Sequence, residues 1–127
     1  MTIVRQAFQI FKQEPESCYF DHASTSQTPD VVLDAMQNYY QSFRANVHRG
    51  VYDWSAKSSQ AYEEARDVVA DFIGATCEEL VFTSGATESI NLVASAYASQ
   101  HLKKQQVILV SALEHHANLI PWQEVAK

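Results

Sequence analysis

Two short, uninterrupted apolar runs in the last third of the chain constrain its fold more than any other feature. The runs cover residues 80–83 and 107–110, and a stretch with helical periodicity at about 86–102 separates them. A continuous apolar run is typical of a strand that is buried on both faces of a parallel sheet. Strand, helix, strand and a further helix from residue 118 therefore predict an α/β fold with a mostly parallel sheet and a right-handed crossover.

The rest of the chain is predicted to be mainly helical. Apolar positions at helical spacing predict one helix over 2–13. The sequence TPD at 28–30 combines a capping hydroxyl, a first-turn proline and an acidic charge, so a second helix is expected over about 30–44. Residues 45–57 have no clean period and predict a loop. A third helix is expected over about 58–74, closing at a glycine.

Composition and charge exclude several classes of protein. The chain has 127 residues, 46% of them hydrophobic, which is ordinary for about one globular domain. A net charge of -6 argues against a nucleic-acid partner and against an anionic membrane surface. No apolar stretch is long enough to span a bilayer, and the N-terminus is too polar for a secretory signal. A cytoplasmic location is expected. The two cysteines form no CxxC motif, which argues against structural zinc.

A first candidate site lies in FTSGATES, residues 82–89, where a predicted strand ends, a glycine turns the chain and a helix begins. Helix N-termini present unpaired N–H groups that bind anions, most often phosphate. Ser84, Ala86 and Thr87 would offer backbone N–H groups, and Thr87 would add a hydroxyl. The alternative interpretation is a plain capped helix with Glu88 in its first turn. The spacing alone leaves both open.

A second candidate is the histidine pair His115 and His116, which follows the other predicted strand. Parallel sheets bind ligands at the carboxyl ends of their strands, so this loop and the Ser84–Thr87 turn could face one crevice. That arrangement favours a ligand with a phosphate and a ring. A metal ion and a simple loop cap remain the alternatives. A third candidate, His48 beside Arg49, suits a carboxylate-bearing substrate, although on these residues alone a solvated surface loop is the favoured interpretation.

Four segments together resemble the N-terminal part of one family. They are YFDHASTSQTP (19–29), NVHRGVY (46–52), ELVFTSGATESINLVA (79–94) and EHHANLIPWQ (114–123). In this combination and order they are similar to the class V aminotransferase group of pyridoxal-phosphate (PLP) enzymes, and within it to cysteine desulfurases of the Suf/Csd type, including selenocysteine lyase-like members.

The resemblance implies a fold and a domain organisation. The fold is the N-terminal portion of the large domain of a PLP-dependent transferase of fold type I, with an incomplete, mostly parallel sheet and helices. Residues 1–28 would form an N-terminal arm and residues 29–78 a helical segment. Residues 79–127 would begin the PLP-binding α/β domain.

The resemblance also assigns roles around the cofactor. His115 matches the residue that stacks on the PLP ring and assists proton transfer, which makes it the expected catalytic residue. Ala86 and Thr87 match the turn that holds the PLP phosphate. His116 and Asn118 match family positions for which no role is assigned.

Further residues match positions near the substrate. Ala23 matches the loop that approaches the substrate carboxylate, and polar residues at the active-site mouth match His48, Arg49 and Glu88. There are departures from the Suf-type pattern. Ser84 and the neighbouring Ala86 stand where arginine and threonine are common in the Suf-type branch, and they are more similar to the related Isc/Nif branch.

The implied reaction takes sulfur from L-cysteine, giving alanine and an enzyme persulfide for iron–sulfur cluster supply, in a homodimer. The family's PLP-binding lysine, its pyridine-pairing aspartate and its sulfur-accepting cysteine all match positions beyond Lys127. The isolated chain is therefore expected to be inactive and to bind PLP weakly or not at all. Two other hypotheses remain open. One is a non-catalytic remnant or partner-binding subunit of a split enzyme, completed by another chain. The other is a small module that binds a phosphate ligand.

Overall fold

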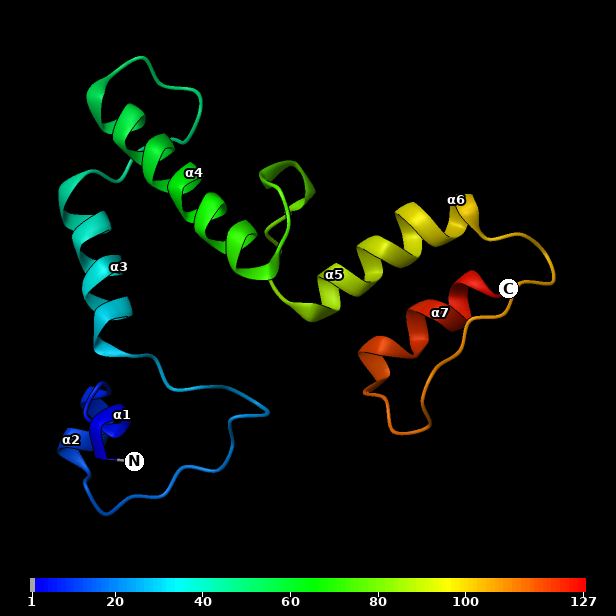
Figure 1. Ribbon diagram of the computed structural model, residues 1–127, viewed down its shortest axis with the longest axis horizontal. Helices are drawn as coiled ribbons and strands as arrows, with labels where there is room; N and C mark the ends of the chain where they lie inside the picture. Colours follow the sequence, from blue (N-terminus) through cyan, green and yellow to red (C-terminus); the bar gives the residue numbers. More distant parts are fainter. Residues whose placement is uncertain (1) are drawn as a thin grey trace. The chain divides into compact units, whose positions relative to one another are not determined.

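Helices form all the regular structure that the computed structural model describes, over residues 2–127 (Figure 1). The chain divides into two units, Met1–Cys77 (unit 1) and Glu78–Lys127 (unit 2). Unit 1 runs from blue to green in Figure 1, and unit 2 from yellow-green to red. None of the described helices combines the length and the apolar character needed to cross a membrane.

The N-terminal segment of unit 1 is not the single helix that was predicted over 2–13. It forms α1 (Thr2–Arg5) and α2 (Gln9–Gln13), with Phe8 in an extended conformation between them. The break allows two hydrogen bonds with Asp30. The Gln9 N–H donates to the Asp30 carboxylate at 2.7 Å, and the Asp30 N–H donates to the carbonyl of Ala7 at 2.8 Å. This tertiary contact overrides the local helical period.

Helix α3 (Asp30–Ser42) confirms the helix predicted after residues 28–30. The residue before it, Pro29, is extended and provides no side-chain cap, so Thr28 does not cap the helix as expected. Lys12 of α2 forms an ion pair with Asp30. The hydrogen bond from Lys12 is the main reason that the pKa of Asp30 lies below its usual range. Asp30 therefore carries its charge at the positive end of the α3 dipole.

Helix α4 (Asp53–Ile73) is the longest of the chain, and it begins five residues before the predicted start at Ser58. Its first turns bury Ser55 and Ser58, which are 1% and 2% exposed. A buried face made of serine leaves no hydrophobic period for sequence reasoning to detect. The predicted end is confirmed, because Gly74 closes the helix in the left-handed conformation at φ 72°.

Three serines of α4 hold the irregular backbone that precedes the helix. Ser55, Ser58 and Ser59 all point their hydroxyls at residues 43–50, which we call the stitched loop. The bonds reach the carbonyls of Phe43 (2.7 Å) and Asn46 (2.6 Å) and the N–H groups of Ala45 (3.1 Å), His48 (2.8 Å) and Gly50 (2.9 Å). The loop therefore has a fixed shape without forming regular structure.

Unit 2 contains a continuous helical rod that confirms the helix predicted over 86–102. It consists of α5 (Ala86–Leu92), the π-helical segment η2 (Val93–Ala98) and α6 (Ser99–His101). A short 3₁₀ turn, η1 (Cys77–Glu79), lies at the boundary with unit 1. The wider π turns lie where the rod meets the last helix.

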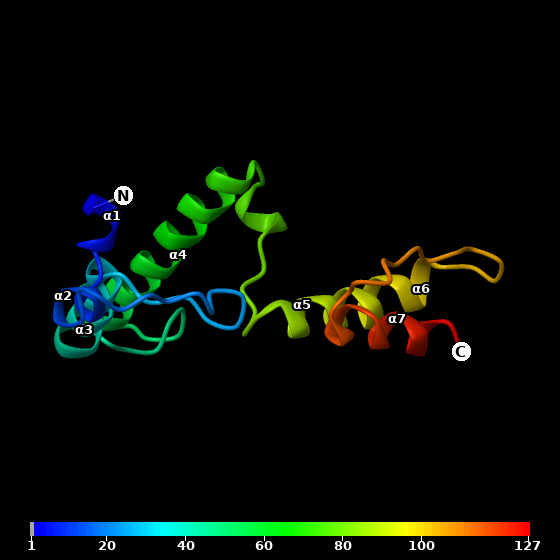
Figure 2. The same cartoon turned by 90° about the horizontal axis from the view of Figure 1, so that it is seen from below.

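The last helix, α7 (Ile120–Val125), follows the 3₁₀ turn η3 (His116–Asn118). It lies alongside η2, as both views show (Figures 1 and 2). Pro121 occupies its first turn, where a missing N–H costs nothing. Buried Ala94 and Ala98 mark the contact face of the rod. Small residues there let the backbones approach closely.

The two strands predicted at 80–83 and 107–110 are absent from the described residues, and so is the parallel sheet. Both segments are free of helix, but no neighbouring segment of the described chain forms a ladder with either. A strand exists only by pairing, and a chain that crosses over once by a helix need not place its first two strands side by side. The apolar runs were identified correctly, whereas the partners that would make them strands were assumed.

Candidate functional site

The turn that begins α5 and the segment that carries the histidine pair belong to neighbouring elements of unit 2. Residues 116–118 form η3, which packs against α5. The two elements are therefore neighbours, and the shared crevice for the turn and His115 stays a prediction. Neither element depends on a β-sheet for this contact, because η3 is held by its own hydrogen bonds and by α7.

The turn at residues 83–87 has the geometry of a backbone anion site. Gly85 lies at φ 157° and ψ -179°, a conformation essentially restricted to glycine. The hydroxyls of Thr83 and Ser89 are 2.7 Å apart and hold the turn onto the helix. The N–H groups of Ala86 and Thr87 fall in the first helical turn, where no intrahelical acceptor exists. The Thr87 hydroxyl has no hydrogen-bond partner within residues 2–127.

The Glu88 side chain forms two hydrogen bonds within this turn. Its carboxylate accepts hydrogen bonds from the Ser84 hydroxyl and the Ser84 N–H, both at 2.6 Å. The hydroxyl bond, followed by the N–H bond, holds the pKa of Glu88 below its usual range. Glu88 thus lies in the first turn of α5, as the alternative interpretation of the motif predicted, but the N-cap is Gly85, which provides no side-chain hydrogen bond. Glu88 engages Ser84 and leaves Ala86 and Thr87 as the donors that an incoming anion would meet.

His115 is exposed and is oriented by its own backbone. It caps η3, and its Nδ1 accepts a hydrogen bond from the Ala117 N–H at 3.1 Å. The neutral ring therefore carries its proton on Nε2. The His116 ring lies 4.0 Å away, centroid to centroid, at a tilt of 31°. One face of His115 is thus next to His116, whereas its Nε2 makes no hydrogen bond and its ring stacks on no other aromatic side chain among the described residues.

Asn118, which had no assigned role, links the histidine segment to the last helix. Its amide group donates to Glu114 at 2.9 Å, and its carbonyl oxygen accepts from the indole N–H of Trp122 at 2.9 Å. These two bonds bracket the histidine pair. Asn118 is therefore a positioning residue for this segment.

The remaining predicted site residues belong to unit 1. His48 lies in the stitched loop at φ 67°, and its Nε2 is 2.7 Å from Glu63 of α4. Its ring also meets Tyr62 edge-on at 5.6 Å. Arg49 is exposed and makes no ion pair in the part of the chain described here. Ala23 is exposed in a turn. Glu63 was missed by sequence reasoning, because an acidic residue on a helix has no distinguishing pattern.

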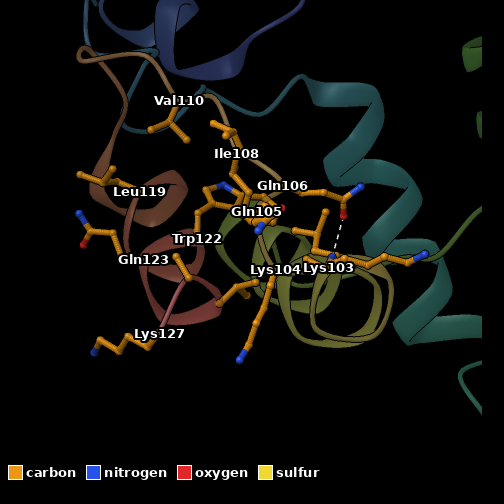
Figure 3. A pocket seen from close by; sticks show the side chains of 15 residues that line it. Lys103, Lys104, Gln105, Gln106, Ile108, Val110, Leu119, Trp122, Gln123 and Lys127 are labelled. Atoms are coloured by element: carbon orange, nitrogen blue, oxygen red, sulfur yellow. Dashed lines mark hydrogen bonds between the residues drawn. The ribbon is translucent and has the colours of Figure 1, made fainter.

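A separate hollow of about 740 Å³ lies elsewhere in unit 2 (Figure 3). Figure 3 shows Trp122, Ile108 and Val110 at its wall, with Lys103 and Lys104 at its border. The side chain of Gln106 accepts a hydrogen bond from the Lys103 N–H at 2.7 Å, which closes the chain reversal before residue 107. Neither His115 nor Thr87 lines it, so it is distinct from the candidate cofactor site.

A known protein family matches most of the chain. The family described as aminotransferase class-V matches residues 18–127. The chain belongs to the aminotransferase class-V family. Curated relatives include a probable cysteine desulfurase of Pyrococcus abyssi, 51% identical over 88% of this chain and 28% of that protein. A cysteine desulfurase of Synechococcus elongatus is 43% identical over 97% of this chain and 20% of that protein.

A solved structure supports the fold of this class V chain. The apo structure of the cysteine desulfurase from Thermococcus onnurineus NA1 is 45% identical and matches with a TM-score of 0.89. The match covers 98% of this chain and 30% of that one. The chain therefore has the backbone of the N-terminal part of a PLP-dependent class V aminotransferase. It spans between 19% and 32% of the curated relatives that it matches.

Proposed function

We propose that this class V chain provides the cofactor-facing surface of a PLP-dependent cysteine desulfurase-type enzyme. The observation that carries the proposal is the likeness, at a TM-score of 0.89 and 45% identity, to an enzyme of that name. The reaction of such an enzyme is sulfur removal from L-cysteine, giving alanine and a persulfide for iron–sulfur cluster supply. The proposed setting is a cytoplasmic homodimer.

The residues at the α5 turn fit the phosphate of PLP. Ala86 and Thr87 offer two backbone N–H groups at the positive end of a helix, and Thr87 adds an unengaged hydroxyl. The Glu88 carboxylate accepts two hydrogen bonds from Ser84, so its negative charge is engaged by donors within the turn. PLP, when bound, supplies an electron sink for the substrate.

His115 would stack on the PLP ring and assist proton transfer. Its free face suits stacking on a flat aromatic ligand, and its Nε2 edge can hold or release a proton. Asn118 and the Ala117 N–H fix the orientation of the segment. Ala23, His48 and Arg49 are proposed to bind substrate. Arg49 would pair with the substrate carboxylate, and His48 would be held by Glu63.

The chain alone is proposed to lack desulfurase activity. None of its lysines, at positions 12, 57, 103, 104 and 127, matches the lysine to which the resembled enzymes attach PLP. The test is alanine release from L-cysteine by the purified chain supplied with PLP. We expect none above the rate of free PLP. Release above that rate that is lost in His115→Ala would contradict this expectation.

The cofactor site is tested with pyridoxine 5′-phosphate, which lacks the aldehyde and so cannot react with the five lysines. Equilibrium dialysis is expected to show weak binding, reduced about tenfold in Thr87→Ala by loss of a charge-assisted hydrogen bond. His115→Ala should lower the affinity for this ligand and for unphosphorylated pyridoxine alike. Thr87→Ala should lower the affinity for the phosphorylated form only.

Two matched variants control for general damage. Thr25→Ala and His101→Ala remove the same side chains from positions outside the proposed site. Both should retain the affinity of the unmodified chain. If the two site variants and the two controls all bound pyridoxine 5′-phosphate equally well, the assignments of the phosphate and ring contacts would both be wrong.

A further inference from the structure

His48 has a strained backbone conformation, and contacts with α4 hold it there. Its φ of 67° lies in the left-handed region, which residues other than glycine adopt at a cost in free energy. The His48 N–H donates to the Ser59 hydroxyl at 2.8 Å, and the ring Nε2 lies 2.7 Å from the Glu63 carboxylate. Strain of this kind persists only where the surroundings enforce it, and it is common at functional sites. The conformation therefore points to a role for His48 beyond closing the loop.

Glu63 determines which nitrogen of the neutral His48 ring carries the proton. A carboxylate only accepts hydrogen bonds, so the Nε2 of His48 must be the donor in this pair. Nδ1 is then unprotonated, and it makes no hydrogen bond with any described residue. The Tyr62 ring meets the His48 ring edge-on at 5.6 Å and limits its rotation from another side. The half-exposed His48 ring thus offers a hydrogen-bond acceptor to a ligand.

The charges near this acceptor restrict the ligand group that it can bind. Arg49 is the next residue, is exposed and makes no ion pair within the described chain, so it suits a carboxylate. An unprotonated Nδ1 cannot bind a carboxylate, because both groups are acceptors. It requires a donor on the ligand. An amino acid carries such a donor, its ammonium group, on the same carbon atom as its carboxylate.

We propose that Glu63 is a positioning residue for substrate binding, which fixes His48 with its proton on Nε2. Nδ1 of His48 would then accept a hydrogen bond from the α-ammonium group of an amino acid whose carboxylate pairs with Arg49. This inference rests on the proposed function for the substrate class and for the role of Arg49. All the groups that it involves belong to unit 1, and the whole chain is the test material.

The first measurement is the tautomer of His48 in the whole chain, from the ring ¹⁵N shifts in the pH range where these shifts show a neutral ring. We expect no detectable tautomer with the proton on Nδ1. Glu63→Gln should make that tautomer detectable, because an amide can donate to Nε2 as well as accept from it. The matched control is Glu64→Gln, which alters a neighbouring carboxylate that accepts from Gln60 at 2.7 Å. This control should leave the tautomer unchanged, and circular dichroism checks that both variants keep their helices.

The second measurement is an NMR titration with L-alanine and with propionate, two acids that differ only in the ammonium group. L-Alanine also lacks the thiol of L-cysteine, so the ammonium group is its only donor. Both acids should shift the side-chain Nε–H resonance of Arg49, whereas only L-alanine should shift Nδ1 of His48. Glu63→Gln should lower the affinity for L-alanine about three- to tenfold, as expected for one hydrogen bond, and leave that for propionate unchanged. General damage to the loop would lower both affinities.

The outcomes separate this inference from the proposed function. The inference is wrong if the unmodified ring carries its proton on Nδ1, or if Glu63→Gln changes neither the tautomer nor the affinity for L-alanine. A shift of Nδ1 by propionate as large as that by L-alanine would also overturn it. If Arg49 responds to both acids and His48 to neither, the proposed carboxylate site stands and the inference falls. If Arg49 responds to neither acid, the proposed role of Arg49 is itself wrong.

Discussion

The stitched loop and the segment 107–110 are both irregular, but they differ in what satisfies their backbones. In the stitched loop, three serine hydroxyls bond five backbone groups between Phe43 and Gly50. In the segment 107–110, none of the four residues makes a hydrogen bond with a described residue. The first is therefore satisfied by side chains of its own unit, whereas the backbone of the second lies in an exposed segment and is left to solvent. Irregular structure can thus be held firmly or loosely, depending on which groups satisfy its backbone.

Among the variants that test this comparison, Gly50→Val is expected to have the largest effect on stability. A Cβ at Gly50 would lie 2.4 Å from the side chain of Ser55, so the substitution must displace the loop from α4. We expect a loss of about 3 kcal/mol in the free energy of unfolding, at the upper end for overpacking. Urea unfolding followed by circular dichroism measures it.

The control for this prediction is Gly74→Ala. No atom lies within 4 Å of its new methyl group, so only the left-handed backbone at φ 72° is penalised, by about 1–2 kcal/mol. A smaller loss for Gly50→Val than for Gly74→Ala would show that the loop is not held tightly against Ser55.

The next largest effect is expected from Ser58→Ala. Ser58 is 2% exposed and bonds both the Phe43 carbonyl and the Ala45 N–H, which would be left buried without a partner. The free energy of unfolding should fall by about 1–3 kcal/mol. Ser42→Ala removes an exposed hydroxyl that bonds only Asn38, and should change the value by less than about 0.5 kcal/mol. Equal effects would mean that the serine hydroxyls do not hold the loop.

These serines also explain what could be predicted from the sequence. The end of α4 at Gly74 was predicted correctly, because local chemistry determines it. The start of α4 was missed because its buried face is polar. The break before Gln9 was missed because its cause is Asp30, twenty-one residues away. The sheet was predicted from two apolar runs that form no ladder in the described part of the chain. Of the candidate site, the α5 turn and His115 stay predictions of the sequence, and the two hydrogen bonds between Glu88 and Ser84 could be found only from the geometry.

A smaller effect is expected at the α5 turn, where a charge satisfies the backbone locally. The pKa of Glu88 is lowered by Ser84, so its stabilising contribution is fully present above the ordinary glutamate value of 4.5. That contribution is lost as the pH falls through the lower pKa of the folded chain. NMR titration of the side-chain carbonyl carbon should give a pKa below 4.5.

Ser84→Ala should raise the pKa of Glu88 toward the ordinary value, because the hydroxyl bond is the larger cause and only the N–H bond remains. The pKa of Asp30, which is lowered mainly by Lys12, should not change. An unchanged Glu88 pKa in this variant would mean that the carboxylate is not held by Ser84 in solution.

The smallest effect is expected from Leu109→Ser, and it tests the other half of the comparison. Leu109 is almost fully exposed, so its loss should change the free energy of unfolding of this chain by less than about 0.5 kcal/mol. Ile108→Ser, one residue earlier, removes a half-buried side chain from the wall of the hollow and should cost about 1 kcal/mol. The same urea unfolding measures both. A loss from Leu109→Ser as large as that from Ile108→Ser would show that the Leu109 side chain is already covered in solution. In that case 107–110 would resemble the stitched loop, which is held by side chains of its own unit.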